Sequence, residues 1–264
     1  MLPYIGPLIQ AYRQGLASDH IHLGYWEAPP QGAVTPADWR EAQARLTDQI
    51  LTMADLRAGL DVADAGCGIG GTLRAIRRRW GNAGRLVGIN PDPRQLALCP
   101  GPAEGVALLR ADALDLPLSD GCLDRVICLE AAFHFASRRG FFQQAARVLR
   151  PGGLLVLGDL LGDASGLAEA DRMCAAAVLV RDFGPWPDPW QDEAGVVTDL
   201  EAAGFAVRDL RDITARTLPS YEVVAPASVS DLRHPALDGA RAMRWLQENG
   251  ALRYVLIAAQ KPEA

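Results

Sequence analysis

The stretch Asp61-Val-Ala-Asp-Ala-Gly-Cys-Gly-Ile-Gly-Gly-Thr72 decides the fold of this chain. A short apolar strand pattern ends here in a loop with glycines at 66, 68, 70 and 71, and a helix pattern follows from Thr72 to Arg79. Glycines at this spacing allow a sharp turn and let a ligand approach the backbone without a Cβ in the way. The helix behind them offers unpaired N–H groups. The stretch predicts a site for a nucleotide-like ligand, with a tight strand-to-helix turn that binds nothing as the alternative.

Asp64, two residues before the first glycine, discriminates between possible ligands. Gly66, Gly68 and Gly71 also satisfy the dinucleotide pattern G-x-G-x-x-G, which is weak evidence alone. A carboxylate at this place would repel a pyrophosphate, but it suits a ligand that carries positive charge and hydrogen-bond donors. S-adenosylmethionine has that chemistry in its ammonium and sulfonium groups.

Composition and charge narrow the class of function. The chain has 264 residues, which fits one large domain or two small ones. Its net charge of −6 does not favour nucleic acid or an anionic membrane surface as a partner. No run approaches the roughly 20 apolar residues of a membrane span.

The cysteines and the N-terminus bear on the compartment. Five cysteines show no C-x-x-C pair and no metal-ligand spacing, so we expect reduced thiols, a cytoplasmic setting and no bound metal. The N-terminus lacks a basic region followed by a long apolar core, so we expect no signal peptide. The oligomeric state cannot be read from the sequence.

Hydrophobic patterning predicts alternating strands and helices. A helix is expected from 36 to about 53, opened by the capping pattern Thr35-Pro36-Ala37-Asp38, and the first 35 residues are predicted to be irregular. The alternation that follows indicates βαβ units and a mostly parallel sheet. The predicted strands are 61–65, 85–90, 106–110, 124–129, 153–158, 205–211 and 252–259. The predicted helices are 71–80, 92–99, 138–149, 161–182, 192–203 and 236–248, with a rigid aromatic and proline loop at 183–190.

Four segments in this order resemble the class I S-adenosylmethionine-dependent methyltransferases, strongly over residues 36–160. They are Asp64-Ala-Gly-Cys-Gly-Ile-Gly70, Leu86-Val-Gly-Ile-Asn-Pro91, Arg110-Ala-Asp-Ala-Leu-Asp-Leu-Pro117 with Asp124-Arg-Val126, and Leu149-Arg-Pro-Gly-Gly153. Each is weak alone, but together they are specific. His22-Leu-Gly-Tyr-Trp26 and Leu129-Glu-Ala-Ala-Phe-His-Phe135 resemble the branch that methylates natural products, sugars, sterols and similar small molecules.

The resemblance implies an α/β, Rossmann-like fold. It has seven mostly parallel strands with an antiparallel last pair, helices on both faces and a helical or loop cap over the pocket. We expect one methyltransferase domain over 1–264. Its parts are an N-terminal lid segment (1–35), the cofactor-binding core (36–160), cap elements interleaved with the sixth strand (161–250) and the last strand (251–264).

The resemblance also implies which residues bind S-adenosylmethionine. Asp64 and the glycine loop would meet the methionine end, Asp112 and the Ala113 N–H the adenine edge, and Glu130 opens the loop under the cofactor. Many members have an acidic residue at position 90 for the ribose. Asn90 can still accept one hydrogen bond and donate another there. The full expected set is Asp64, Gly66, Cys67, Gly68, Gly70, Asn90, Pro91, Gln95, Asp112, Ala113 and Glu130.

Catalysis needs alignment of the reacting groups, and a base if the acceptor is a hydroxyl. His134, after the fourth strand, is the candidate base, with a structural histidine as the alternative. Asp159 could orient that histidine or act itself, or else cap a helix. His20 could line the pocket or be structural. Residues that could line the acceptor pocket or form a lid, or only pack, are His22, Tyr25, Trp26, Phe183, Trp186 and Trp190.

The predicted function is transfer of a methyl group from S-adenosylmethionine to a small organic molecule. Oxygen is the first choice of acceptor, and nitrogen and carbon, including isoprenoid or sterol carbon, stay open. Two other classes remain: a Rossmann-type NAD-dependent oxidoreductase, and a protein that binds S-adenosylmethionine without catalysis. Asp64 and the absence of an acidic residue at position 90 argue against the oxidoreductase.

Overall fold

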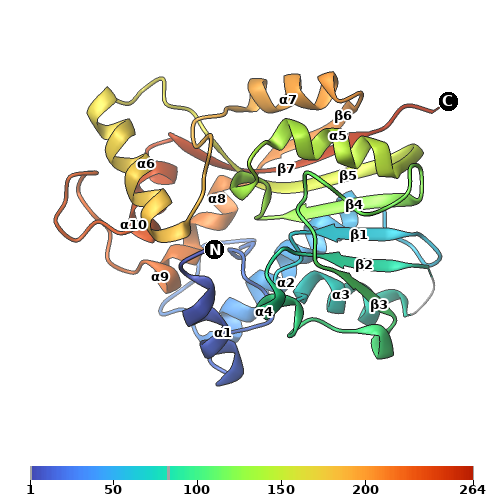
Figure 1. The fold of residues 1–264 in the computed structure, drawn as a ribbon. Coiled ribbons are helices and arrows are strands. Elements are labelled where there is room, and N and C mark those ends of the chain that lie inside the picture. The colour runs from blue at the N-terminus through green and yellow to red at the C-terminus, as the bar shows by residue number, and fades with distance from the viewer. Residues whose placement is uncertain (1, 82–83, 264) are drawn as a thin grey trace.

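A computed structural model describes residues 2–81 and 84–263; residues 1, 82–83 and 264 of the predicted domain lie outside the described residues. Seven strands form one sheet in the order β3-β2-β1-β4-β5-β7-β6 (Figure 1). Neighbours are parallel except β7, which runs antiparallel to β5 and β6. The α/β, Rossmann-like fold is thereby confirmed.

The strands and helices have the following bounds. The strands are β1 Val62–Ala65, β2 Leu86–Ile89, β3 Val106–Leu109, β4 Leu123–Leu129, β5 Leu149–Gly162, β6 Ala206–Asp212 and β7 Leu252–Gln260. The α-helices are α1 Ile5–Arg13, α2 Pro36–Met53, α3 Gly71–Trp80, α4 Pro93–Leu96, α5 Arg138–Val148, α6 Glu169–Phe183, α7 Glu193–Ala202, α8 Thr214–Thr217, α9 Tyr221–Val224 and α10 Gly239–Glu248. Short 3₁₀ turns are η1 Pro102–Glu104, η2 Ala132–His134 and η3 Leu218–Ser220.

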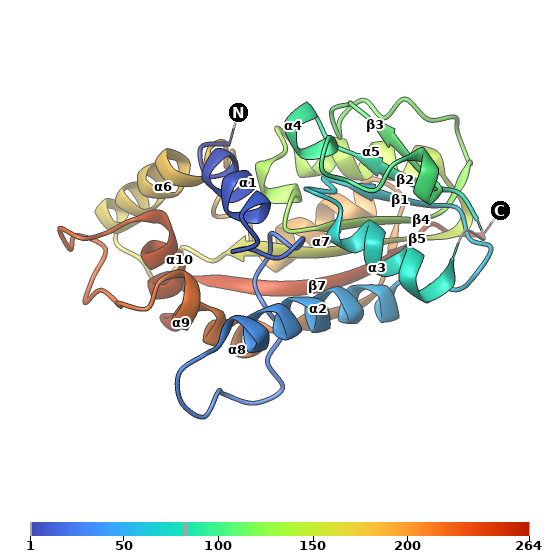
Figure 2. The same cartoon turned by 90° about the horizontal axis from the view of Figure 1, so that it is seen from below.

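Helices cover both faces of the sheet. α5 and α7 lie on one face, and α2 and α3 lie on the other, where α10 also packs (Figures 1 and 2). Side chains of a strand alternate between faces. Leu155 and Leu157 of β5 therefore join the core with α5 and α7, while Val156 and Leu160 join the opposite core. Because both faces are covered, most residues of the central strands are apolar and buried, and Asp64 of β1 and Asp159 of β5 are among the buried exceptions.

The N-terminal segment crosses the sheet as a strap, defined here as residues 18–26. It is bound to α2, where Gln43 Nε2 donates to His22 O at 2.8 Å and Tyr25 N donates to Ala42 O at 2.8 Å. It is also bound to the cap formed by α6, α8, η3, α9 and α10, since Gly24 N donates to Ser220 Oγ of η3 at 2.9 Å. The strap therefore joins the core to the cap beside the carboxyl ends of the parallel strands.

Three predictions about the elements were wrong or incomplete. Residues 5–13, predicted to be irregular, form α1. The usual start signals are missing, because no side chain caps its start and Gly6-Pro7 lies in its first turn, where a proline is tolerated. The helix predicted from 161 begins at Glu169, because β5 continues to Gly162 in antiparallel pairing with β7. The helix predicted over 92–99 is reduced to α4.

The capping pattern before α2 is confirmed. Asp38 N donates to Thr35 Oγ1 at 3.2 Å, and Thr35 N donates to Asp38 Oδ2 at 3.0 Å. Within residues 2–81 and 84–263, no helix has the length and apolar character needed to cross a membrane. The same ranges contain no cluster of three or more His, Cys, Asp or Glu side chains that could hold a metal ion.

Candidate active site

The glycine loop between β1 and α3 has the geometry that its sequence predicts. Gly66, Gly68 and Gly70 have φ values of 78°, 55° and 89°, in the left-handed region that favours glycine. A Cβ placed on Gly68 would lie 2.6 Å from Ile21 Cδ1, and one on Gly66 would lie 2.4 Å from Ala131 Cβ. The strap and the β4–α5 loop thus pack directly on the glycines, which leaves no room for side chains.

A cavity of about 580 Å³ opens at the carboxyl ends of β1, β2 and β4. This is the edge where parallel α/β sheets bind ligands. Ten of the eleven predicted cofactor residues line it; they are Asp64, Gly66, Cys67, Gly68, Asn90, Pro91, Gln95, Asp112, Ala113 and Glu130. Gly70 does not line it: a Cβ there would meet Pro100 Cδ at 2.6 Å, so Gly70 serves the packing of the loop on residues 99–100.

Asp64 is the most informative polar group in this cavity. Its side chain is buried, and its Oδ2 has no hydrogen-bond partner among the described residues. Burial raises the pKa of the Asp64 carboxyl from its ordinary value of 3.8 to about 7. A buried carboxylate is costly unless it is paired. Asp64 therefore fits a cationic, hydrogen-bond-donating ligand such as the ammonium end of S-adenosylmethionine.

Two further groups line the cavity beyond β2 and β3. Asn90 Oδ1 accepts a hydrogen bond of 2.8 Å from Asp92 N, so its amide N–H groups remain available to donate to a ligand. Asp112 Oδ1 accepts from Leu114 N at 2.9 Å, which fixes the turn after β3. Asp92 also lines the cavity, but its carboxylate is paired with Arg94 at 2.6 Å.

Glu130 directly follows β4 and has a strained backbone conformation. Its φ is 49°, which is uncommon for a residue with a side chain, and its Oε1 accepts a hydrogen bond of 2.7 Å from Leu23 N of the strap. Burial raises the pKa of the Glu130 carboxyl to about 7, although the Leu23 N–H opposes this shift. Glu130 therefore ties the strap to the floor of the cavity.

His134 lies in η2, directly after β4, and it also lines the cavity. Its Nδ1 lies 2.8 Å from Pro185 O, and its Nε2 lies 3.3 Å from the hydroxyl of Tyr4. Burial lowers the pKa of His134 to about 4. The imidazole is therefore neutral near pH 7 and able to accept a proton.

Asp159 does not support His134 as predicted. It is buried outside the cavity, where its Oδ2 accepts from Arg138 Nε at 2.8 Å and its Oδ1 accepts from Leu160 N at 2.9 Å. Arg138 in turn donates to Leu160 O and Asp188 O, at 2.9 and 3.2 Å. This buried ion pair fastens the residue 183–192 segment to β5, and the hydrogen bonds of the Asp159 carboxylate go to Arg138 and Leu160 instead of His134.

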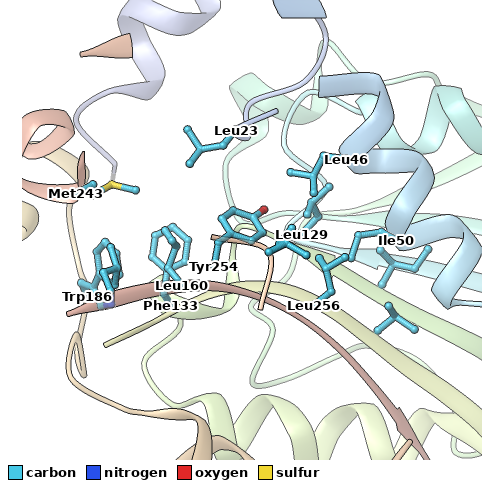
Figure 3. Packing of buried hydrophobic residues seen from close by; sticks show 14 of the residues in the cluster. Leu23, Leu46, Ile50, Leu129, Phe133, Leu160, Trp186, Met243, Tyr254 and Leu256 are labelled. Carbon is cyan, nitrogen blue, oxygen red and sulfur yellow. The ribbon is translucent and has the colours of Figure 1, made fainter. Parts of the chain in front are cut away.

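The predicted lid is only partly correct. His22 and His20 line the cavity, but Tyr25, Trp26, Phe183, Trp186 and Trp190 do not. Trp26 Nε1 donates to Ser220 Oγ at 3.1 Å, and Trp186 packs on Phe133 with ring centroids 4.4 Å apart (Figure 3). Trp26 therefore joins the strap to η3, and Trp186 joins the 183–190 loop to η2, because apolar aromatic area is best buried.

Other residues take the place of these rings at the cavity wall. Leu2, Tyr4, Pro185 and Pro187 line the end next to His134, together with Phe135. The prolines belong to the loop that the sequence singled out. Leu2 and Tyr4 lie at the start of α1, and no local signal marked them as site residues.

Comparisons with known proteins agree with this geometry. Residues 63–157 match a family model described as a methyltransferase domain. The 27-O-demethylrifamycin SV methyltransferase of Amycolatopsis mediterranei (strain S699) is 33% identical over 94% of this chain and 92% of its own length. Methyltransferase GfsG of Streptomyces halstedii is 28% identical over 94% of this chain and 90% of its own.

Solved structures show the same fold. A geranyl diphosphate methyltransferase in complex with GPP and sinefungin is similar with a TM-score of 0.76 at 20% identity, covering 96% of this chain and 93% of that chain. The [4+2]-cyclase SpnF has a TM-score of 0.74 at 24% identity, covering 99% and 95%. Because a cyclase shares the fold, the fold alone does not define the chemistry.

The chain belongs to the class I S-adenosylmethionine-dependent methyltransferases. It is an enzyme of small-molecule methylation, and S-adenosylmethionine is its cofactor. The oxidoreductase and the non-catalytic alternative are not favoured.

Proposed function

We propose that this enzyme methylates a hydroxyl group of an apolar natural product. The observation that supports this most is that one cavity is lined by both an unpartnered, buried Asp64 and a neutral His134. The wall near His134 is mainly apolar, with Leu2, Phe135 and the prolines of the 183–190 loop. The 27-O-demethylrifamycin SV methyltransferase, similar along nearly the whole chain, is named for an oxygen acceptor.

In this proposal the residues around Asp64 hold the cofactor. Asp64 and the backbone of the glycine loop would bind the methionine end, the Asn90 amide the ribose, and Asp112 with the Ala113 N–H the adenine. Glu130 would fix the strap over the bound molecule. S-adenosylmethionine supplies a methyl group already activated by the sulfonium.

His134 would act as the general base. A carbonyl oxygen only accepts hydrogen bonds, so Pro185 O requires the proton on Nδ1. The Nε2 lone pair is then free to take the proton of an acceptor hydroxyl as the oxygen attacks. Burial lowers the pKa of His134 to about 4, so the ring is unprotonated at neutral pH, and Nε2 takes the proton only as attack on the methyl group makes the hydroxyl acidic.

Two measurements test the proposal. Calorimetry with S-adenosylmethionine and with NAD should give heat of binding only for the first. Turnover should then be measured by mass spectrometry with 27-O-demethylrifamycin SV, other hydroxylated natural products and geranyl diphosphate. A gain of one methyl on oxygen supports the proposal, and methylation only of geranyl diphosphate carbon contradicts it.

His134→Gln should lower kcat by roughly 10²–10⁴-fold, since a placed base contributes about that much. Cofactor affinity should be unchanged. His234→Gln, at an exposed histidine, is the matched control and should behave like the wild type. Near-normal kcat in His134→Gln would refute the base and favour catalysis by proximity alone.

A further inference from the structure

α1 brings one residue to the catalytic end of the cavity. Tyr4, just before α1, lines the cavity, and its ring stacks on His134 with centroids 6.1 Å apart and 27° between the planes. Its other neighbour is Phe183, which it meets edge-on at 5.7 Å. Leu2 packs on the turn that follows Phe183: a Cβ on Gly184 would lie 2.9 Å from Leu2 Cδ2. The start of α1 is therefore held against the loop that also binds His134.

The hydrogen bonds of His134 define what Tyr4 does there. Because Pro185 O fixes the proton on Nδ1, the Nε2 atom is an acceptor in the neutral ring. The Tyr4 hydroxyl, 3.3 Å away, must then donate its proton to Nε2. This is the contact that an acceptor hydroxyl needs before it loses its proton to His134.

We propose that, before the acceptor binds, the phenol of Tyr4 occupies the place of the acceptor hydroxyl at His134 Nε2. The proposal rests on the proposed function, because it assigns Nε2 as the basic atom. The acceptor displaces the phenol and takes over its hydrogen bond. An acceptor that matches this place carries its hydroxyl on an apolar ring, since the place is held by a phenol ring that stacks on His134 and meets Phe183 edge-on.

The Tyr4–His134 bond can be measured without the acceptor. The chain has four histidines, so ¹⁵N-histidine spectra can be assigned with His134→Gln and His234→Gln. We expect His134 to be in the Nδ1–H tautomer, and we expect its Nε2 to have the ¹⁵N chemical shift of a nitrogen that accepts a hydrogen bond. In Tyr4→Phe the tautomer should remain, and Nε2 should move toward the shift of a free pyridine-type nitrogen. Tyr12→Phe, within α1, should change neither the tautomer nor the Nε2 chemical shift.

The pKa of His134 gives a second readout. A donor to neutral Nε2 stabilises the neutral ring, so its loss in Tyr4→Phe should raise the pKa of His134. The charges of Arg138 in α5 and Asp159 in β5 also act on the pKa of His134, and the charge of Glu130 acts on the pKa of Tyr4. These three residues are present in both the wild type and Tyr4→Phe, so a difference in the His134 pKa between the two reports the lost hydroxyl. A purely structural role for Tyr4 would lower the melting temperature without this shift.

Displacement is tested with 2-naphthol, a hydroxyl on an apolar ring, in the presence of S-adenosylhomocysteine. It should bind Tyr4→Phe about 2- to 12-fold more tightly than the wild type, because in the variant it does not have to break the Tyr4–His134 bond, and one net hydrogen bond changes an affinity by about this factor. An Nε2–H tautomer, an unchanged Nε2 shift in Tyr4→Phe or equal naphthol affinities would overturn the proposal. If the spectra behave as expected but His134→Gln keeps its turnover, the base assignment fails while the placement of Tyr4 stands.

Discussion

Asp64→Asn should stabilise the cofactor-free enzyme while weakening cofactor binding. Burial raises the pKa of Asp64 from 3.8 to about 7, a difference of about 3 units. At about 1.36 kcal/mol per unit, holding this carboxylate ionised in the folded state costs about 4 kcal/mol at pH 8. Asparagine keeps the shape without the charge, so it removes this cost.

The sign of the pH dependence follows from proton binding. The folded state keeps the Asp64 proton where the unfolded state has lost it, so the wild type loses stability as pH rises from 3.8 to 7. The gain in Asp64→Asn should therefore be larger at pH 8 than at pH 5, by roughly 2–3 kcal/mol. The figure of 4 kcal/mol is an upper bound, because the buried amide also needs partners.

Cofactor binding should change in the opposite direction. Loss of a hydrogen bond to a charged group costs about 1.5–3 kcal/mol, which is roughly 10- to 150-fold in Kd for S-adenosylmethionine. Urea unfolding at pH 5 and 8 and calorimetry measure the two effects. Asp120→Asn, at an exposed surface carboxylate, should alter neither. Equal destabilisation of Asp64→Asn at both pH values, or an unchanged Kd, would refute the reasoning.

Three further substitutions test the site. Gly68→Ala should weaken cofactor binding, because its Cβ is strained at a φ of 55° and pushes on Ile21 of the strap that packs on the loop. Gly59→Ala, also at positive φ but with nothing within 4 Å, should only lower stability slightly in a thermal melt. Asp112→Ala should weaken cofactor binding by about 1–3 kcal/mol in calorimetry, and an unchanged Kd would exclude its adenine role. Asp159→Asn should lower unfolding free energy by roughly 3–5 kcal/mol by leaving Arg138 buried and unpaired. If Asp159→Asn had normal stability but a strongly reduced kcat, Asp159 would have a catalytic role instead.

Local sequence determined the cofactor half of the site. The strand, the glycines and the following helix are set by near neighbours: only glycine adopts φ values of 55° to 89° freely, and alternating patterns define the strands. Asp64, Asn90 and Asp112 follow directly after or within predicted strands, so their meeting at one edge of a parallel sheet could be expected. Their roles toward the cofactor remain predictions.

The tertiary structure decided the acceptor half. Tyr4 reaches His134 across 130 residues, and Asp159 finds Arg138 rather than the histidine, because α1 and the 183–192 loop pack against the end of β4. The sequence allowed the aromatic residues of the strap and the loop to form either a lid or buried packing, and the fold buries Trp26 and Trp186 away from the cavity. Such choices depend on which distant surfaces pack together, and hydrophobic patterning, which reports only that a side chain is to be buried, does not contain that information.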